Sequence, residues 1–321
     1  MKTVFIVNPN AGRGKKFHNA VSAIKNICSK FGAEVYVTKA VGDASIFVRD
    51  YCSQNGPARF ISCGGDGTFN EVLNGAIGFE GTQLGIVPIG TGNDFCRNFA
   101  AHEGFFDLEG QMFGKCVKCD AIRYVLKEND KTKIGYCANM FNVGFDCAVA
   151  DTTNTVKEKT FFFGPLAYFV SIFINLVMKK TSNLEVEIDG KREFCGELLL
   201  TSIANGCYCG GGLKTNPIAC TNDGLININI VKNISRIKFL QLLPRYIKGS
   251  YLKLRSIEKI VSSKKCRKVK ITSPKCIRIS IDGEITNTQI SEFEIVHNAF
   301  DFVVPNKFIM EGVSTDAKST V

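Results

Sequence analysis

SCGGDGTFNE, residues 62–71, sets the expected architecture of the first half of the chain. It follows the apolar segment 58–61, which is typical of a short β-strand, and it leads into Asn70–Gly75, which has the pattern of the first turns of a helix. A glycine-rich turn from strand to helix brings several backbone N–H groups together without Cβ atoms in the way, at the positive end of the helix dipole. The turn therefore predicts a phosphate-binding site.

Asp66 lies inside this turn, although a carboxylate repels phosphate. One interpretation is that Mg²⁺ lies between the carboxylate and the phosphate. A second is that the acid orients the loop and its neighbours. The plainest alternative is a glycine-rich turn with an Asp helix cap and no ligand at all.

Three other loops are expected at the ends of strands. The first, residues 8–15, follows the strand predicted over 2–7 and combines Gly12 and Gly14 with cations. The second is at Thr38, which ends a strand predicted over 33–37. The third is the turn 90–94, which follows a strand predicted over 84–89. Helices predicted over 17–31 and 43–55 separate these strands. This alternation favours a doubly wound α/β domain with a mostly parallel sheet, whose ligands bind at the carboxyl ends of the strands.

Asp94 in the last of these turns allows two interpretations. Asp94 either holds a metal ion or anchors the side chain of Arg97. The alternative is that Asp94 only caps the following helix and has no role in binding or catalysis.

After Asp120 the sequence changes to short strands with few long helices. The predicted strands cover 134–142, 184–189, 197–204, 225–231, 268–272, 277–281, 293–297 and 300–304. This series predicts an antiparallel β-sandwich. Two of its turns are candidates for chemistry: Asp223-Gly224 before a strand, and Asp282-Gly283-Glu284, which is either an ordinary hairpin turn or places Glu284 as a general base.

Composition is typical of a two-domain soluble protein of 321 residues. The 14 Cys residues have no regular spacing and no secretory signal precedes them, which favours free thiols in a reducing cytosol. The C-x-x-C pair at Cys116 and Cys119 lacks a second pair, so zinc is not expected.

Charge and hydropathy both bear on membranes. The segment 232–270 holds thirteen Lys or Arg against one acid, Glu258, a balance of +12, whereas the whole chain carries +10. Its partner is predicted to be an anionic membrane surface, since no nucleic-acid motif accompanies the charge, and a solvated face is the plain alternative. The uncharged run Phe161–Met178 is predicted to be a buried or interfacial helix, because Gly164-Pro165 leaves it short for a bilayer.

Four motifs together resemble the diacylglycerol-kinase catalytic-domain family. They are Asn8-Pro9-x-x-Gly12, Gly64-Gly65-Asp66-Gly67-Thr68-x-Asn70-Glu71, Pro88-x-Gly90-Thr91-Gly92-Asn93-Asp94-Phe95-x-Arg97 and Asp282-Gly283-Glu284. The second motif alone is shared with NAD kinases. The resemblance covers roughly residues 2–305, and it is closest to the soluble bacterial lipid kinases.

The resemblance implies an ATP-binding α/β domain at 1–122, a β-sandwich lipid-substrate domain at 123–305, an active site in the cleft between the domains, and a tail at 306–321 that packs back or is disordered. The nucleotide site falls on Asn8, Pro9, Asn10, Ala11, Gly12, Thr38, Gly64, Gly65, Asp66, Gly67, Thr68, Asn70, Glu71 and Thr91. An acid network linked to Mg²⁺ falls on Asp66, Asp94 and Asp120. A second Mg²⁺ is implied at Asp223 with the backbone carbonyls of Cys220 and Leu225, and Glu284 matches the catalytic base.

The implied activity is transfer of the γ-phosphate of ATP, as its Mg²⁺ complex, to the hydroxyl of diacylglycerol. Another lipid acceptor (phosphatidylglycerol, ceramide or a sphingoid base), an NAD kinase and a non-catalytic membrane-binding protein remain alternatives. We expect a cytoplasmic enzyme that associates peripherally with the membrane and does not bind nucleic acid. A homodimer through the sheet edges of the second domain is a further expectation.

Overall fold

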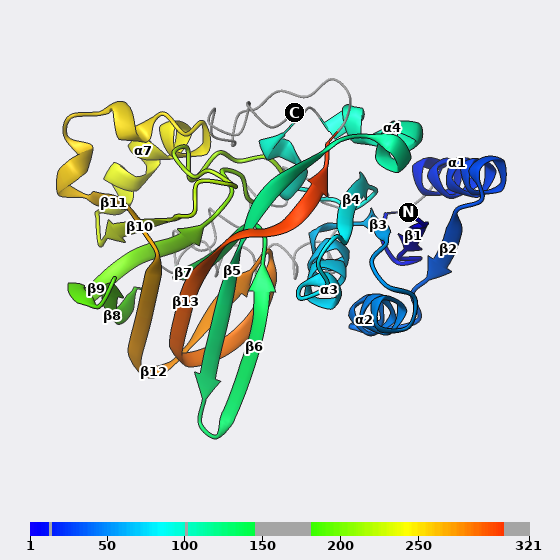
Figure 1. Ribbon diagram of the computed structural model, residues 1–321. Helices are drawn as coiled ribbons and strands as arrows, with labels where there is room; N and C mark the ends of the chain where they lie inside the picture. The colour runs from blue at the N-terminus through cyan, green and yellow to red at the C-terminus, as the bar shows by residue number, and fades with distance from the viewer. Residues whose placement is uncertain (13–14, 100–101, 145–180, 305–321) are drawn as a thin grey trace. The chain divides into compact units, whose positions relative to one another are not determined.

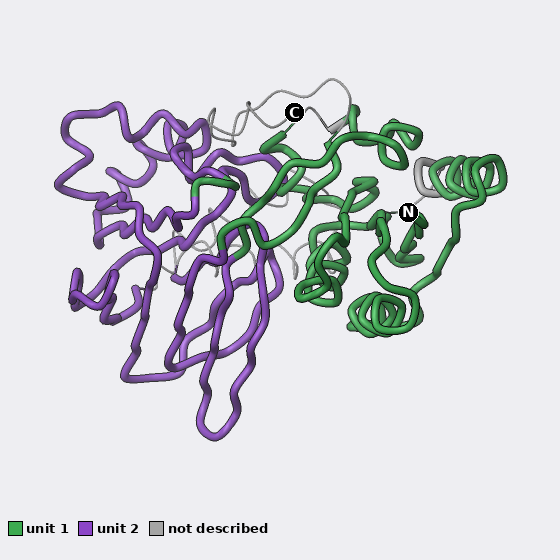
Figure 2. The backbone as a smooth tube through the Cα atoms, viewed as in Figure 1, with its two compact units in different colours: residues 1–121, 221–223, 297–321 green, residues 122–220, 224–296 purple. Residues whose placement is uncertain are grey.

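The computed structural model describes residues 1–12, 15–99, 102–144 and 181–304 (Figure 1). These residues form two compact units (Figure 2). Of the described residues, unit 1 comprises those up to 121 together with 221–223 and 297–304, and unit 2 comprises the others. The 20-residue strand β13, Glu284–Val303, contributes to both units, because its last residues pair within unit 1.

A parallel sheet forms the centre of unit 1. Its strands are β1 (Thr3–Val7), β2 (Glu34–Val37), β3 (Arg59–Gly64) and β4 (Gln83–Pro88), in the order β2-β1-β3-β4. The end of β13 continues the sheet beside β4, also in parallel, with Asp301 opposite Gln83. The strands β1 and β3 are buried along their whole length, as expected for strands that helices cover on both sides.

Helices cover both faces of this sheet, which confirms the predicted doubly wound arrangement. They are α1 (Lys15–Phe31), α2 (Asp43–Asn55), α3 (Asp66–Ala76) and α4 (Leu108–Phe113), with 3₁₀ turns at Phe95–Asn98 and His102–Phe106. Ile24 of α1 and Met112 of α4 pack with Phe5 on one face. On the other face the rings of Tyr51 in α2 and Phe60 in β3 meet edge to face, with centroids 5.5 Å apart.

The helix after the glycine motif begins earlier than predicted. Its first residue is Asp66 rather than Asn70, and Gly65 is its extended N-cap residue. The prediction missed this start because Gly67 within the first turn is a poor helix former. Only Gly65 therefore remains between the end of β3 and the start of α3.

Antiparallel strands build unit 2. They are β5 (Cys116–Glu128), β6 (Lys131–Cys137), β7 (Met140–Gly144), β8 (Ser182–Ile188), β9 (Lys191–Ala204), β10 (Ile226–Lys232), β11 (Val261–Cys266), β12 (Lys268–Ile281) and β13. The strands β7 and β8 each pair with both β9 and β12. Phe141, Ile228 and Phe293 lie in the apolar core between them. The predicted β-sandwich is confirmed.

Several strand predictions in unit 2 need correction. The single strand predicted over 134–142 is two strands, β6 and β7, with a break at Ala138 and Asn139. The two strands predicted over 268–272 and 277–281 are one strand, β12, whose register against β13 shifts between Thr272 and Ile277. Strand β5 was not predicted at all.

The basic segment carries one helix, α7 (Arg236–Ile247), followed by 3₁₀ turns at Tyr251–Lys253 and Ile257–Lys259. The run Phe161–Met178, predicted to be a buried or interfacial helix, and the predicted tail lie outside the described residues. Within the described ranges, no helix has the length and apolar character needed to cross a membrane.

Candidate active site

The strand-end loops of unit 1 meet at one rim of the sheet. Asn8 follows β1, and its amide Nδ2 donates a hydrogen bond to Thr68 Oγ1 in α3 at 2.9 Å, while its backbone N–H donates to the carbonyl of Cys63 at 3.1 Å. Thr38 follows β2 and donates its backbone N–H to the carbonyl of Val7. Since these strands are neighbours and parallel, their carboxyl ends present the loops side by side, as the sequence predicted.

Glycines are required where two of these loops touch. The backbone N–H of Gly90 donates to the carbonyl of Gly64 at 3.0 Å. A Cβ on Gly90 would collide with the Cα of Gly65 and lie 2.9 Å from its nitrogen. Gly12, with φ of 78°, comes equally close to the turn after β4, because its Cβ would lie 2.9 Å from the carbonyl oxygen of Ile89. The three loops therefore form one tightly packed backbone surface.

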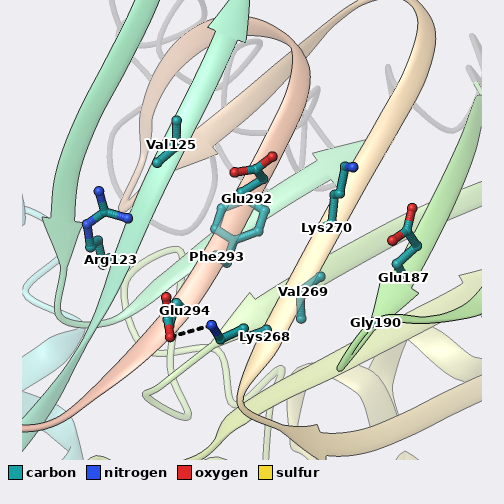
Figure 3. Close-up of a pocket in the computed structure, with 10 residues that line it drawn as sticks. All are labelled: Arg123, Val125, Glu187, Gly190, Lys268, Val269, Lys270, Glu292, Phe293 and Glu294. Carbon is teal, nitrogen blue, oxygen red and sulfur yellow. Dashed lines mark ion pairs between the residues drawn. The ribbon is translucent and has the colours of Figure 1, made fainter.

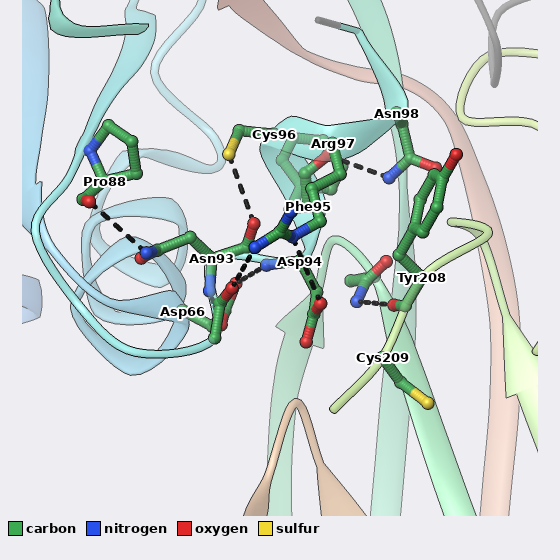
Figure 4. A network of polar contacts seen from close by, with 12 residues as sticks. Asp66, Pro88, Asn93, Asp94, Phe95, Cys96, Arg97, Asn98, Tyr208 and Cys209 are labelled. Carbon is green, nitrogen blue, oxygen red and sulfur yellow. Dashed lines mark hydrogen bonds and ion pairs between the residues drawn. The ribbon is translucent and has the colours of Figure 1, made fainter. Parts of the chain in front are cut away.

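Asp66 joins the two glycine-rich turns (Figure 4). Its Oδ2 accepts the backbone N–H of Asn93 at 2.7 Å, and its Oδ1 accepts the backbone N–H of Asp94 at 2.8 Å. Burial raises the pKa of the Asp66 carboxyl, and the backbone hydrogen bonds oppose that rise. Of the interpretations offered by the sequence, the geometry favours the one in which the acid orients the loop.

Asp94 occupies the start of the following 3₁₀ turn and is 7% exposed. Its Oδ1 lies 3.7 Å from Nε of Arg97, so the predicted anchoring of Arg97 is present as a loose ion pair. Arg97 also donates from Nη2 to the carbonyl of Gly92 at 3.3 Å. A Cβ on Gly92 would lie 2.6 Å from Asp66 Oδ2, so the lack of a side chain at Gly92 lets the Asp66 carboxylate reach the turn that holds Asp94.

The remaining predicted nucleotide residues lie around the same rim. Asn10 donates its backbone N–H to Asn8 Oδ1 at 2.9 Å, which folds the first loop back on itself. Pro9, Asn10 and Thr91 are exposed, whereas Ala11 is buried. Gly67 lies in the first turn of α3, where backbone N–H groups have no partner inside the helix.

Glu71 has a structural partner that the sequence did not suggest. Its two carboxylate oxygens accept the backbone N–H groups of Gly42 at 2.9 Å and of Ala44 at 3.2 Å. Glu71 therefore caps the amino-terminal end of α2 from the neighbouring helix. The side chain of Asn70 also has a local partner, since its Oδ1 accepts a hydrogen bond from Asn74 Nδ2.

Asp120 is fully buried and fixes the segment after residue 296. Its Oδ1 lies 2.8 Å from Nδ1 of His297 and accepts the backbone N–H of Asn298 at 2.8 Å. Its own backbone N–H donates to the carbonyl of Thr221 at 2.7 Å. Sequence reasoning missed His297, because 177 residues separate it from Asp120 and no local pattern marks the pair.

In unit 2, Glu284 begins β13 directly after a tight hairpin turn. Asp282 and Gly283 have φ of 46° and 93°, which is the conformation of a two-residue hairpin loop, and Glu284 pairs in register with Ile281. The Glu284 side chain is exposed. Burial raises the pKa of nearby Tyr124, and the charges of Cys137, Glu284 and Asp282 add to this rise.

Asp282 holds the turn that carries Glu284. Its Oδ1 accepts the backbone N–H of Met140 at 2.9 Å, and its Oδ2 lies 3.1 Å from Sγ of Cys137, which donates to it. The break between β6 and β7 is therefore bonded to the turn between β12 and β13. The sequence marked Asp282 only as a turn residue.

The second Mg²⁺ site, implied at Asp223 with the carbonyls of Cys220 and Leu225, stays a prediction. Asp223 is half-buried. Among the residues that the structure describes, no three His, Cys, Asp or Glu side chains are grouped so that they could hold a metal.

Comparisons with known proteins agree with the two-part organisation. The family model for the diacylglycerol kinase catalytic domain matches residues 2–122, and that for the YegS C-terminal NAD kinase beta sandwich-like domain matches residues 139–304. A protein named diacylglycerol kinase from Mycobacterium tuberculosis is 26% identical over 314 residues, covering 95% of both chains. One with the same name from Bacillus subtilis is 25% identical over 306 residues, covering 94% of this chain and 96% of its own.

A solved structure has the same fold. The crystal structure of a diacylglycerol kinase from Bacillus anthracis superimposes with a TM-score of 0.68 at 21% identity, and covers 95% of this chain and 97% of its own. The two family models together match residues 2–122 and 139–304, which is most of the chain. The chain therefore belongs to the diacylglycerol kinase catalytic-domain family and carries the YegS-type C-terminal domain.

Proposed function

We propose that the protein is an ATP-dependent lipid kinase that transfers the γ-phosphate to the hydroxyl of diacylglycerol or a related lipid alcohol. The observation that supports it best is the backbone cradle at Gly64, Gly65 and Gly90, which Asp66 braces. Kinases of this chemistry need positioning and charge neutralisation rather than a covalent intermediate. A backbone cradle that these contacts hold rigid, at the start of a helix, meets the first of these requirements.

The phosphate groups bind at the start of α3. Gly65 is the N-cap residue and makes no side-chain cap, so the first N–H groups of the helix are available to an anion. Gly65 is also the least crowded glycine of the cradle. A Cβ built on it would meet only the Cα of Gly90, at an ordinary contact distance of 3.5 Å. The carboxylate of Asp66 faces Asn93 instead, and so does not oppose the phosphate at close range.

Mg²⁺ fits this site as an ion held partly through water. Asp66 and Asp94 supply carboxylate oxygens, which Mg²⁺ prefers. Both Asp66 oxygens already accept backbone N–H groups, so a water molecule would link this carboxylate to the ion. When bound, the ion offsets the negative charge that develops on the transferred phosphoryl group.

Glu284 accepts the proton of the lipid hydroxyl as that oxygen attacks phosphorus. An exposed carboxylate at the start of a strand suits a general base that must meet an incoming alcohol. Asp282 fixes the turn before it through Met140 and Cys137, which limits the positions that Glu284 can take.

The direct test is transfer of label from γ-labelled ATP to lipid. The purified protein is mixed with labelled ATP, Mg²⁺ and mixed micelles that contain diacylglycerol, ceramide, sphingosine or phosphatidylglycerol, and a parallel reaction contains NAD⁺. We expect labelled phosphatidic acid from diacylglycerol. Label in NADP⁺ alone, or in no acceptor, would overturn the proposal.

A lipid acceptor implies work at a membrane surface. The excess of cations in 232–270 supports an anionic surface as the place of action, since each Lys or Arg near such a surface contributes about 1 kcal/mol. We therefore propose peripheral association with the membrane.

A further inference from the structure

The helix α7, Arg236–Ile247, has two apolar sides rather than one. Its inner side, with Phe239 buried and Leu243 and Tyr246 partly buried, packs on the sheet residues Leu200 and Val231. This contact explains the attachment of the helix to unit 2. It does not explain the side chains on the opposite side.

The outer side exposes two large apolar residues. Ile237 is 71% exposed and Leu240 is 49% exposed, and they lie three residues apart, so they share one face of the helix. The other strongly exposed large apolar side chains among the described residues of unit 2 are Ile134 and Ile218, which lie in other elements. A single exposed apolar residue needs no explanation, but a pair on one helix face does.

Exposed cations lie on the same helix and at its C-cap. Lys238, Arg245 and Lys248 are exposed, and no carboxylate among the described residues lies within ion-pair distance of them. Ser235 caps the start of the helix, because its Oγ accepts the backbone N–H of Lys238. The outer face of α7 is thus apolar at its centre and positive at its edge.

The strand part of the same basic segment is different, because acids from other strands neutralise it. Lys264 Nζ lies 2.6 Å from Glu193, and Lys268 Nζ lies 2.8 Å from Glu294. A pocket of about 270 Å³ near Lys268 is lined by three cations and three acids, as Figure 3 shows: Arg123, Lys268, Lys270, Glu187, Glu292 and Glu294. Part of the charge on the sheet is therefore paired with acids, whereas Lys238, Arg245 and Lys248 have no carboxylate of the described residues within ion-pair distance.

We propose that the outer face of α7 docks on an anionic lipid membrane, with Ile237 and Leu240 entering the interface and the cations contacting lipid phosphates. This inference rests on the proposed function, because a lipid kinase must meet its substrate at a bilayer. Interfacial helices combine an apolar centre with Lys and Arg in this way. A nucleic acid would be attracted by the cations alone and would gain nothing from the two apolar side chains.

Tryptophan fluorescence tests the docking directly, because the chain contains no Trp. The variants Ile237→Trp and Leu240→Trp each carry one reporter on α7, and Ile134→Trp carries one at a comparably exposed position, 57%, on β6. Vesicles of phosphatidylglycerol and phosphatidylcholine are added to each. We expect the emission of both α7 variants to shift to shorter wavelength and to be quenched by brominated lipid, with no change for Ile134→Trp.

Binding measurements separate the two contributions. In cosedimentation with the same vesicles, Ile237→Ser combined with Leu240→Ser lowers the partition coefficient about tenfold or more, from lost apolar burial. Lys238→Gln lowers it about fivefold, and this loss disappears at high salt. Ile134→Ser and Lys133→Gln on β6 are the matched controls and leave binding unchanged.

Activity then distinguishes this inference from the proposed function. The Ile237→Ser, Leu240→Ser variant keeps full turnover on a short-chain diacylglycerol in detergent micelles and loses turnover on vesicles. Absence of lipid phosphorylation in micelles by the unchanged protein would refute the kinase and leave the fluorescence result intact. Unshifted emission at residues 237 and 240 while the protein binds vesicles would refute docking through α7. Retention on single-stranded DNA but not on vesicles would assign the face to nucleic acid instead.

Discussion

Asp66 Oδ2 lies 2.7 Å from the backbone nitrogen of Asn93, a residue 27 positions further along the chain. This bond connects the turn after β3 to the turn after β4, and the second oxygen of Asp66 repeats the connection at Asp94. An acid inside a glycine-rich phosphate motif thereby has a physical role that does not depend on any ligand. It fixes the relative position of the two turns that form the cradle.

Replacing Asp66 by Asn should destabilise unit 1 in a pH-dependent way. Asn has one oxygen acceptor in place of two, so we expect a loss of about 2 kcal/mol in unfolding free energy at neutral pH. Because burial raises the folded-state pKa of Asp66, the folded protein holds this proton more tightly than the unfolded chain. The stability that Asp66 confers on the native protein therefore falls as the pH rises from the usual Asp range through the raised pKa.

The measurement is urea denaturation of both proteins between pH 4 and pH 7. The stability difference between them should be larger at pH 4 than at pH 7. A difference that grows with pH would contradict this assignment.

Two glycines of the cradle should respond differently to the same change. Gly90→Ala places a Cβ against the backbone of Gly65 and should reduce the unfolding free energy by about 2 kcal/mol or more. Gly65→Ala meets only an ordinary contact at 3.5 Å, so the fold should remain stable while the affinity for ATP falls. Thermal denaturation and ATP titration of both variants test this. Normal ATP binding by a stable Gly65→Ala protein would remove Gly65 from the phosphate site.

Glu71 should affect stability rather than nucleotide binding. Glu71→Gln leaves one carbonyl oxygen for the two N–H groups at the start of α2, and the expected loss is about 1 kcal/mol. ATP affinity, measured by calorimetry, should stay the same. Weaker ATP binding without loss of stability would contradict this prediction. It would show that Glu71 acts in the nucleotide site and that its bonds to the start of α2 do not determine its role.

The parallel half of the fold was accessible from sequence because its signals are local. Each βα turn carries glycines, and the apolar residues Phe60 and Ile61 mark β3 directly before its turn. The start of α3 at Asp66 was missed because Gly67 weakens the helix pattern, although the tertiary bonds of Asp66 hold that turn in place.

The rest could not be predicted because it depends on distant partners. The bonds of Asp120 to His297 and of Glu71 to Gly42 connect residues whose local patterns are ordinary. Strand β12 was divided in two because its register shift interrupts the apolar alternation. Distant partners also matter in the basic segment 232–270. Its net charge can be counted from the sequence, but the ion pairs that neutralise some of its cations, such as Lys264 with Glu193, cannot.

Asp282 should act on turnover through the position of Glu284. Asp282→Asn keeps a residue that tolerates positive φ but replaces one of its two acceptors by a donor. We expect unfolding free energy to fall by about 1–2 kcal/mol, and kcat for lipid phosphorylation to fall with the Kd for ATP unchanged. Steady-state kinetics and ATP titration decide the matter. An unchanged kcat would show that the turn does not need this anchor.

The most direct measurement is the rate of γ-phosphate transfer from labelled ATP to diacylglycerol by the Glu284→Gln protein. If Glu284 is the general base, kcat falls by a factor on the order of 10²–10⁴ while ATP binding and stability stay unchanged. The matched control is Glu292→Gln on the same strand, whose carboxylate lies 3.8 Å from Lys127 and which should keep its turnover. Full activity of Glu284→Gln, or an equal loss in Glu292→Gln, would contradict the account.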